Sequence, residues 1–146
     1  MKKILIVDDD DFKINNIKEV INELEVYYNV TIEKSLNCGL RRIRNETFDI
    51  ILLDMSMPTF SITDSQNFDS YGGKTFLKEM KRKKIEIPVI VITQYDIFGE
   101  GSSQKTAEKL DKDFKESFSN YVGMVKYSSI QNDWKLSLKQ EFENLK

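Results

Sequence analysis

Short apolar runs alternate along the chain with longer segments in which apolar residues recur at helical spacing. The three clearest runs cover residues 4–7, 50–53 and 89–92, and no polar residue interrupts them. Such runs are typical of strands buried on both faces, which occur in parallel sheets covered by helices. Two further strands are predicted at 30–32 and 121–127.

Each predicted strand is followed by apolar residues at intervals of three or four, which predicts an amphipathic helix. These stripes are Phe12, Ile17, Val20, Ile21 and Leu24; Leu36, Leu40 and Ile43; Phe76, Leu77 and Met80; Leu110, Phe114 and Phe118; and Trp134, Leu138, Phe142 and Leu145. Five strand–helix units joined by right-handed crossovers predict a doubly wound, three-layer α/β sandwich.

The length of 146 residues suits a single domain, which we expect to span residues 1–146. Two connections are long: a loop at 58–73, rich in Ser, Thr, Asp and Asn, and a segment at 94–120 that contains a Gly–Ser stretch. Both leave strand ends that carry polar residues. Two interpretations are open: decoration of the fold, or a functional role for at least one of the two segments.

Polar side chains stand at the ends of the three clearest strands. Asp8 and Asp9 follow the first, Asp54 follows the second, and Thr93 follows the third. The carboxyl ends of parallel strands meet at one edge of the sheet, where ligands bind in this type of fold. Neighbouring carboxylates repel one another unless a cation intervenes, and Mg²⁺ is bound by such groups. The remaining carboxylate is then a candidate nucleophile toward phosphorus, with Thr93 and Lys126 placed to hold phosphoryl oxygens.

Composition and charge argue against several classes of function and partner. The net charge is −2 with both signs interspersed, which does not favour nucleic acid or an anionic membrane as a partner. The chain has no histidine, which excludes histidine-based triads, His-ligated zinc and a phosphohistidine relay. A single cysteine and the lack of a signal-like segment suit a cytoplasmic protein.

At these residues the chain resembles the CheY-like receiver domain of two-component response regulators. The matching segments are Ile-Val-Asp-Asp at 6–9, Leu-Asp-Met-Ser-Met-Pro at 53–58, Ile-Thr at 92–93 and Val-Lys at 125–126. They occur in the order typical of that family and span nearly the whole chain. The resemblance implies a flavodoxin-like sheet with strand order 2-1-3-4-5, in a receiver that has no output domain.

The resemblance also implies a role for each matching residue. Asp54 would be the phosphoacceptor, Thr93 the switch hydroxyl and Lys126 the lysine that pairs with the phosphoryl group. The implied Mg²⁺ ligands are Asp8, Asp9, Asp54 and the backbone carbonyl of Ser56. Asp10 and Asp11 are instead expected to cap the helix that follows them.

The chain departs from the family pattern around the last strand. Gln94 follows the threonine where the family prefers a small residue, and Gly123 stands where the aromatic switch residue is usual. Tyr127, in place of proline, follows Lys126. Two registers of the strand are open: one directs Lys126 to the site, and one shifted by a residue directs Tyr127 there.

The sequence therefore favours a receiver, not an enzyme beyond autocatalytic phosphorylation and dephosphorylation. A sensor histidine kinase or another phosphodonor would phosphorylate Asp54, and a downstream protein effector would read the change. One alternative is a receiver-like interaction module that phosphorylation does not control. A less favoured alternative is a haloacid-dehalogenase-type phosphatase, in which Asp8 is the nucleophile and Asp10 the acid/base. The kinase, the effector, the oligomeric state and the acyl phosphate lifetime stay open.

Overall fold

The computed structural model describes residues 2–55, 57, 72–94, 97–98 and 105–145. Its elements, in chain order, are β1 (Lys2–Val7), α1 (Asp11–Asn22), β2 (Tyr28–Glu33), α2 (Leu36–Asn45), β3 (Ile50–Leu53), α3 (Gly72–Arg82), β4 (Val89–Thr93), β5 (Ile97–Phe98), β6 (Lys105–Thr106), α4 (Ala107–Ser117), β7 (Tyr121–Lys126) and α5 (Asp133–Glu143).

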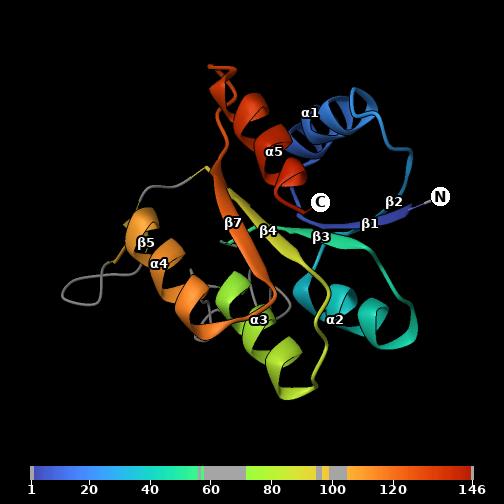
Figure 1. The fold of residues 1–146 in the computed structure, drawn as a ribbon, viewed down its shortest axis with the longest axis vertical. Coiled ribbons are helices and arrows are strands. Elements are labelled where there is room, and N and C mark those ends of the chain that lie inside the picture. The colour runs from blue at the N-terminus through green and yellow to red at the C-terminus, as the bar shows by residue number, and fades with distance from the viewer. Residues whose placement is uncertain (1, 56, 58–71, 95–96, 99–104, 146) are drawn as a thin grey trace.

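The main sheet has five strands in the order β2-β1-β3-β4-β7, and every neighbouring pair is parallel. Helices α1 and α5 cover one face, and α2, α3 and α4 cover the other (Figure 1). The predicted flavodoxin-like sandwich with strand order 2-1-3-4-5 is therefore confirmed. One feature was not predicted: β5 and β6 form a short antiparallel pair within the segment 94–120.

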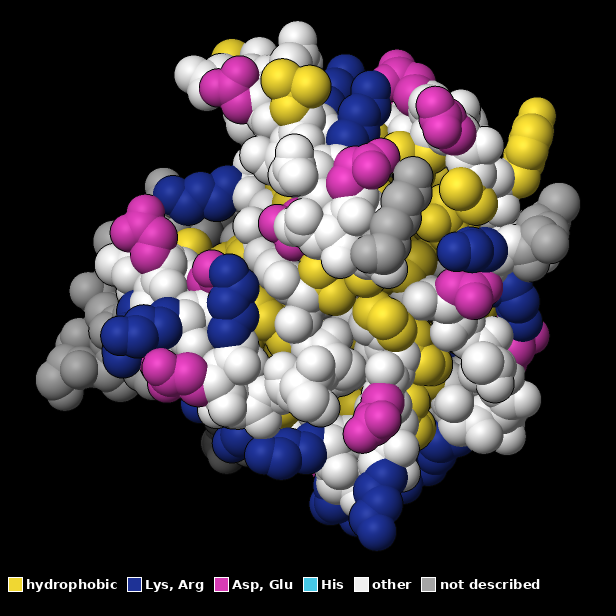
Figure 2. All heavy atoms as spheres, in the orientation of Figure 1, with side chains coloured by type: hydrophobic (Ala, Val, Ile, Leu, Met, Phe, Trp, Pro, Cys, Tyr) yellow, Lys and Arg dark blue, Asp and Glu magenta, His cyan; other side chains and the backbone are white. Residues whose placement is uncertain are grey.

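Two apolar clusters fill the space between the sheet and its helices. Side chains of β1 and β3 divide between the clusters by alternation, so that Leu5 and Leu53 lie with α2 and α3, whereas Ile4 and Leu52 lie with α1 and α5. Basic and acidic side chains are interspersed over the surface shown in Figure 2. No helix among the described residues is long and apolar enough to cross a membrane.

The start of α1 differs from the predicted stripe. Phe12 was expected to face the core, but its side chain is 63% exposed. Lys13 is instead buried on the same face as Ile17. A four-residue step rotates a helix by about 40° beyond a full turn, whereas the five-residue step from Phe12 to Ile17 rotates it by about 140°. The stripe therefore begins at Lys13.

The start of α3 fixes the chain that leaves β3. A Cβ atom on Gly72 would lie 1.9 Å from the backbone oxygen of Met57, so no larger residue fits there without a backbone shift. The Gly73 amide donates a hydrogen bond to the Met55 carbonyl. Helix α3 begins at Gly72, so the last two residues of the expected loop 58–73 lie in the helix, and residues 58–71 lie outside the described part of the chain.

Helix α5 occupies the space beside β7 that an aromatic side chain would need. A Cβ atom on Gly123 would lie 2.3 Å from Oε2 of Glu141. No described residue forms a hydrogen bond with this buried oxygen. Burial raises the pKa of Glu141, Lys115 opposes the rise, and Asp111 adds to it. Gly123 therefore leaves room for an acidic side chain that α5 supplies.

We expect Phe76→Ala to lower the free energy of unfolding by about 3–5 kcal/mol, because Phe76 is completely buried in the cluster beneath α3. Phe12→Ala is the matched control, with an expected change within about 0.5 kcal/mol because its ring is exposed. Urea unfolding followed by circular dichroism measures both changes. Equal losses in the two variants would contradict the burial assigned to these rings.

We expect Glu141→Gln to raise the free energy of unfolding at pH 7 by less than about 1 kcal/mol, since it removes a charge next to the sheet that solvent screens only in part. Because the folded protein holds the Glu141 proton to higher pH than the unfolded chain, the carboxylate destabilises the fold only as the pH rises above the ordinary glutamate range. The gain should therefore vanish near pH 4 in thermal unfolding. Glu143→Gln, at an exposed position of α5, is the control, and an equal gain there would contradict this reading.

Candidate functional site

The backbone at the ends of β1 and β3 brings two carboxylates together. Val7 is the register partner of Leu53, and each strand is followed directly by an aspartate. Beyond the strands, the Asp8 amide donates to the Glu33 carbonyl and the Asp54 amide donates to the Val7 carbonyl. The hydrogen-bonded ladder thus continues for one residue and fixes the positions of Asp8 and Asp54.

Asp8, Asp9 and Asp54 form the acidic site predicted from the sequence. One carboxylate oxygen from each lies within 4.8 Å of the others. Asp8 and Asp54 are buried and Asp9 is exposed, so the site opens toward solvent on the side of Asp9. The expected contact between strand ends distant in sequence is therefore present.

Capping of α1 orients the loop that carries this site. The Asp10 side chain accepts hydrogen bonds from the amides of Phe12 and Lys13, and Asp11 lies in the first turn of the helix. The Asp10 amide in turn donates to Oδ1 of Asp8 at 3.0 Å. Asp10 therefore caps the helix as predicted, and the same short loop holds one oxygen of Asp8.

Lys13 is a member of this site that the sequence analysis missed. Its Nζ lies 2.8 Å from Oδ2 of Asp8 and 3.3 Å from Oδ1 of Asp54, and it donates to the Ile92 carbonyl at 2.8 Å. The side chain is only 2% exposed. The ammonium group therefore links the ends of three strands. The available signal in the sequence was its position four residues before Ile17, on the apolar stripe of the helix. Because lysine is seldom fully buried unless it is paired, this position pointed to a carboxylate partner.

Burial and charge have opposite effects on Asp8. Removal from water raises the pKa of the Asp8 carboxyl to about 6, the Lys13 ammonium opposes this, and the Asp54 carboxylate adds to it. The effect of burial on the Asp8 pKa is larger than that of the ion pair with Lys13. The ammonium therefore offsets only part of the cost of holding two carboxylates together away from water. A further positive charge would be favourable here.

The acidic site fits a divalent metal ion by the chemistry of its ligands. Hard cations such as Mg²⁺ prefer carboxylate oxygens, and Asp8, Asp9 and Asp54 present one each within 4.8 Å of one another. The further ligand expected from the sequence, the Ser56 carbonyl, lies outside the described residues. Lys13 already contacts two of the three carboxylates, so an ion and this ammonium would share the same ligands.

Thr93, Lys126 and Tyr127 meet where β4 and β7 end. Thr93 is completely buried, Lys126 is its register partner, and the Tyr127 amide donates to the Thr93 carbonyl at 2.7 Å. The Lys126 side chain is exposed. Tyr127 is buried instead, and its ring centroid lies 5.8 Å from Nζ of Lys13. In this register Tyr127 packs beside the lysine that contacts Asp54, and the pairing role of Lys126 stays a prediction.

The structure places two of the residues that depart from the family pattern. Gln94 is exposed just beyond β4. At Gly123, which stands where the family usually has an aromatic residue, the Glu141 carboxylate of α5 fills the space beside the backbone.

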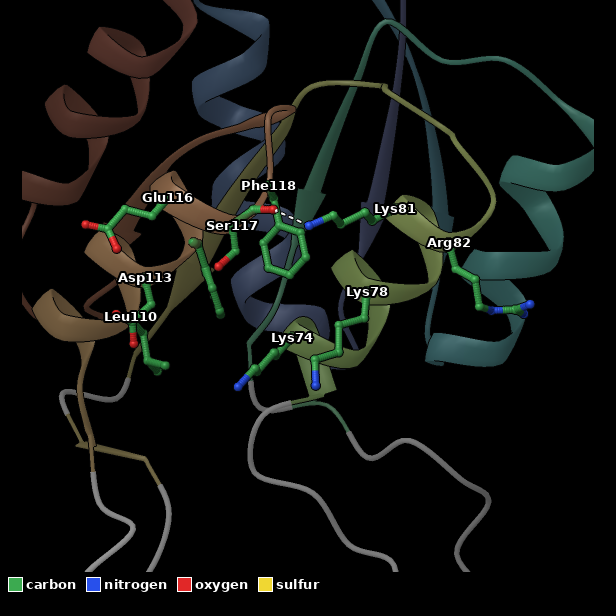
Figure 3. Close-up of a pocket in the computed structure, with 10 residues that line it drawn as sticks. Lys74, Lys78, Lys81, Arg82, Leu110, Asp113, Glu116, Ser117 and Phe118 are labelled. Carbon is green, nitrogen blue, oxygen red and sulfur yellow. Dashed lines mark hydrogen bonds between the residues drawn. The ribbon is translucent and has the colours of Figure 1, made fainter.

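A groove between α3 and α4 lies apart from the acidic site. It has a volume of about 600 Å³ and is shown in Figure 3. Lys74, Lys78 and Lys81 line it from α3, and Nζ of Lys81 donates to the Ser117 carbonyl. Two buried side chains of α4, Leu110 and Phe114, also line it. This groove contains no part of the acidic triad.

Comparison with known proteins agrees with the fold and the site. A family model of the response regulator receiver domain matches residues 4–117, a range that includes the acidic triad and Thr93 and ends before β7. The chain is 30% identical to the Detocs response regulatory protein DtcB of Enterobacter cloacae, with 98% of this chain and 99% of that protein covered. It is 28% identical to the protein y4jR of Sinorhizobium fredii, with 94% of each chain covered.

Solved structures share the fold. The receiver domain of the Francisella response regulator 1452 has 20% sequence identity and a TM-score of 0.61, with both chains fully covered. The response regulator TrrA of Thermotoga maritima, solved in complex with Mg²⁺ and BeF, has 22% identity and a TM-score of 0.65, again over both full chains. The fold, the acidic triad at the strand ends and the match to the family model together show that this chain belongs to the response regulator receiver domain family.

Proposed function

We propose that the chain accepts a phosphoryl group on Asp54 in a reaction that depends on Mg²⁺, and that this changes its binding to a partner protein. The observation that carries the proposal is the position of Asp54 at the end of β3, beside two further carboxylates and an ammonium group. Its side chain is 10% exposed, compared with 2% for Asp8, so Asp54 is the more accessible of the two buried carboxylates.

In the proposed reaction a carboxylate oxygen of Asp54 forms a bond to phosphorus. The bond between phosphorus and the donor's leaving group breaks, and that group departs with the electron pair. Thr93 and Lys126 would hold oxygens of the new acyl phosphate. Mg²⁺ bound by Asp8, Asp9, Asp54 and the Ser56 carbonyl would supply positive charge to the phosphoryl oxygens.

The family implies a kinase as phosphodonor, and we propose a sensor histidine kinase or a small acyl phosphate. The proposed output is altered binding of a downstream protein effector by a single receiver domain spanning residues 1–146. A ligand or modification shifts a conformational equilibrium only through unequal interaction with the two states. The proposed source of that inequality is the phosphoryl group itself, because its oxygens require partners that the free carboxylate does not.

Two observations disfavour the phosphatase alternative. Asp8, its required nucleophile, is buried and already paired with Lys13 and with the Asp10 amide. Asp10, its required acid/base, accepts the hydrogen bonds that cap α1. A receiver-like module that phosphorylation does not control is the stronger rival, because Gly123 replaces the aromatic residue of the usual switch.

Incubation with acetyl phosphate and Mg²⁺ should add one phosphoryl group, detected by intact-protein mass spectrometry. Asp54→Asn should abolish the adduct, because an amide oxygen is a poor nucleophile toward phosphorus. Asp133→Asn, at an exposed position on α5, is the matched control and should be phosphorylated like the wild type. An adduct that persists in Asp54→Asn and is lost in Asp8→Asn would favour the phosphatase reading.

The output is tested by measuring partner capture with and without phosphodonor. Equal binding of wild type and Asp54→Ala in both conditions would contradict phosphorylation control and favour the interaction module.

A further inference from the structure

Lys13 is a buried lysine that the sequence analysis did not predict. It projects from the first turn of α1 into the acidic site, and its three donor contacts are to Asp8, Asp54 and the Ile92 carbonyl. A buried ammonium is costly unless it is paired and hydrogen-bonded, and these contacts meet both conditions. The pairing is with two of the three carboxylates that form the candidate metal site.

The geometry points to competition between this ammonium and a divalent ion. A metal ion coordinated by the triad needs oxygens of Asp8 and Asp54, and Lys13 already donates to an oxygen of each residue. Three ionised carboxylates and one ammonium leave a formal charge of −2 at the site instead of −3. Lower negative charge weakens attraction for a cation, in the way that ligand charge tunes the affinity of calcium sites.

We propose that Lys13 is a tethered counter-cation that holds the site together without metal and weakens its affinity for Mg²⁺. It is a positioning residue, distinct from Lys126, whose proposed partner is the phosphoryl group. The inference rests on the proposed function in one respect, namely that Asp8, Asp9 and Asp54 bind a divalent ion. Phosphorylation would then need Mg²⁺ at concentrations high enough to displace the ammonium from the carboxylates.

The surroundings of Lys13 offer a built-in reporter of this displacement. The centroid of the Tyr127 ring lies 5.8 Å from Nζ of Lys13 and 4.8 Å from the centroid of the Trp134 ring. The Tyr127 hydroxyl accepts a hydrogen bond from Asn16 of α1. Trp134 is the single tryptophan of the chain. Movement of the lysine on Mg²⁺ binding should therefore change Trp134 fluorescence.

Isothermal titration of the full chain with Mg²⁺ tests the proposal directly. Lys13→Met and Lys13→Gln remove the charge and should tighten Mg²⁺ binding about tenfold, since one nearby positive charge is lost. Lys13→Arg keeps the charge and should stay within about threefold of the wild type. Lys83→Met, at an exposed position just after α3, is the control and should also stay within about threefold. Affinities of Lys13→Met and Lys13→Gln within twofold of the wild type would overturn the proposal.

A melting series against Mg²⁺ keeps the test decisive if a variant folds poorly. Loss of Lys13 leaves its two carboxylate partners without their ammonium, so Mg²⁺ should raise the melting temperature of both uncharged variants more than that of the wild type. Equal or smaller shifts would overturn the inference. Absence of Mg²⁺ binding in wild type and variants alike would overturn the metal site as well, whereas binding that ignores Lys13 would leave the proposed function intact.

Discussion

Repulsion among carboxylates held at one edge of a parallel sheet is the constraint on which this end of the molecule depends. Asp8 and Asp54 are fixed by backbone hydrogen bonds that continue the ladder beyond β1 and β3, so they cannot move apart without disturbing the sheet. The Lys13 ammonium contacts both residues and offsets part of this repulsion. Burial still raises the pKa of Asp8, which shows that one ammonium is only part of the compensation.

Several local features serve this arrangement. Asp10 ends the loop after β1 and starts α1, which sets the direction from which Lys13 reaches the site. Gly72 allows α3 to start against the backbone of Met57, three residues after Asp54. On the other side, the buried Tyr127 ring lies near both Lys13 and Trp134 of α5. The candidate phosphoacceptor is thus linked to both α1 and α5, which lie on the same face of the sheet (Figure 1).

The sheet and the triad were predictable because their signals are local and regular. Uninterrupted apolar runs ending in aspartate place Asp8, Asp9 and Asp54 at one edge in any parallel sheet of this order. The burial of Lys13 was not predicted, because lysine is usually a surface residue and only its helical spacing indicated burial. Phe12 was assigned to the core for the converse reason. The way Glu141 fills the space beside Gly123 depends on how α5 packs on β7, which no spacing in the sequence reveals.

In the proposed mechanism, a metal ion displaces the Lys13 ammonium from Asp8 and Asp54 before Asp54 accepts a phosphoryl group. A crystal structure of the protein with Mg²⁺ and beryllium fluoride tests it most directly. We expect an ion coordinated by Asp8, Asp9 and Asp54, a beryllofluoride group on Asp54, and Nζ of Lys13 displaced from its contacts with Asp8 and Asp54. An ion bound at the triad with Nζ of Lys13 still in contact with Asp8 and Asp54 would contradict the exchange, and a triad with neither an ion nor beryllofluoride would contradict the metal site itself.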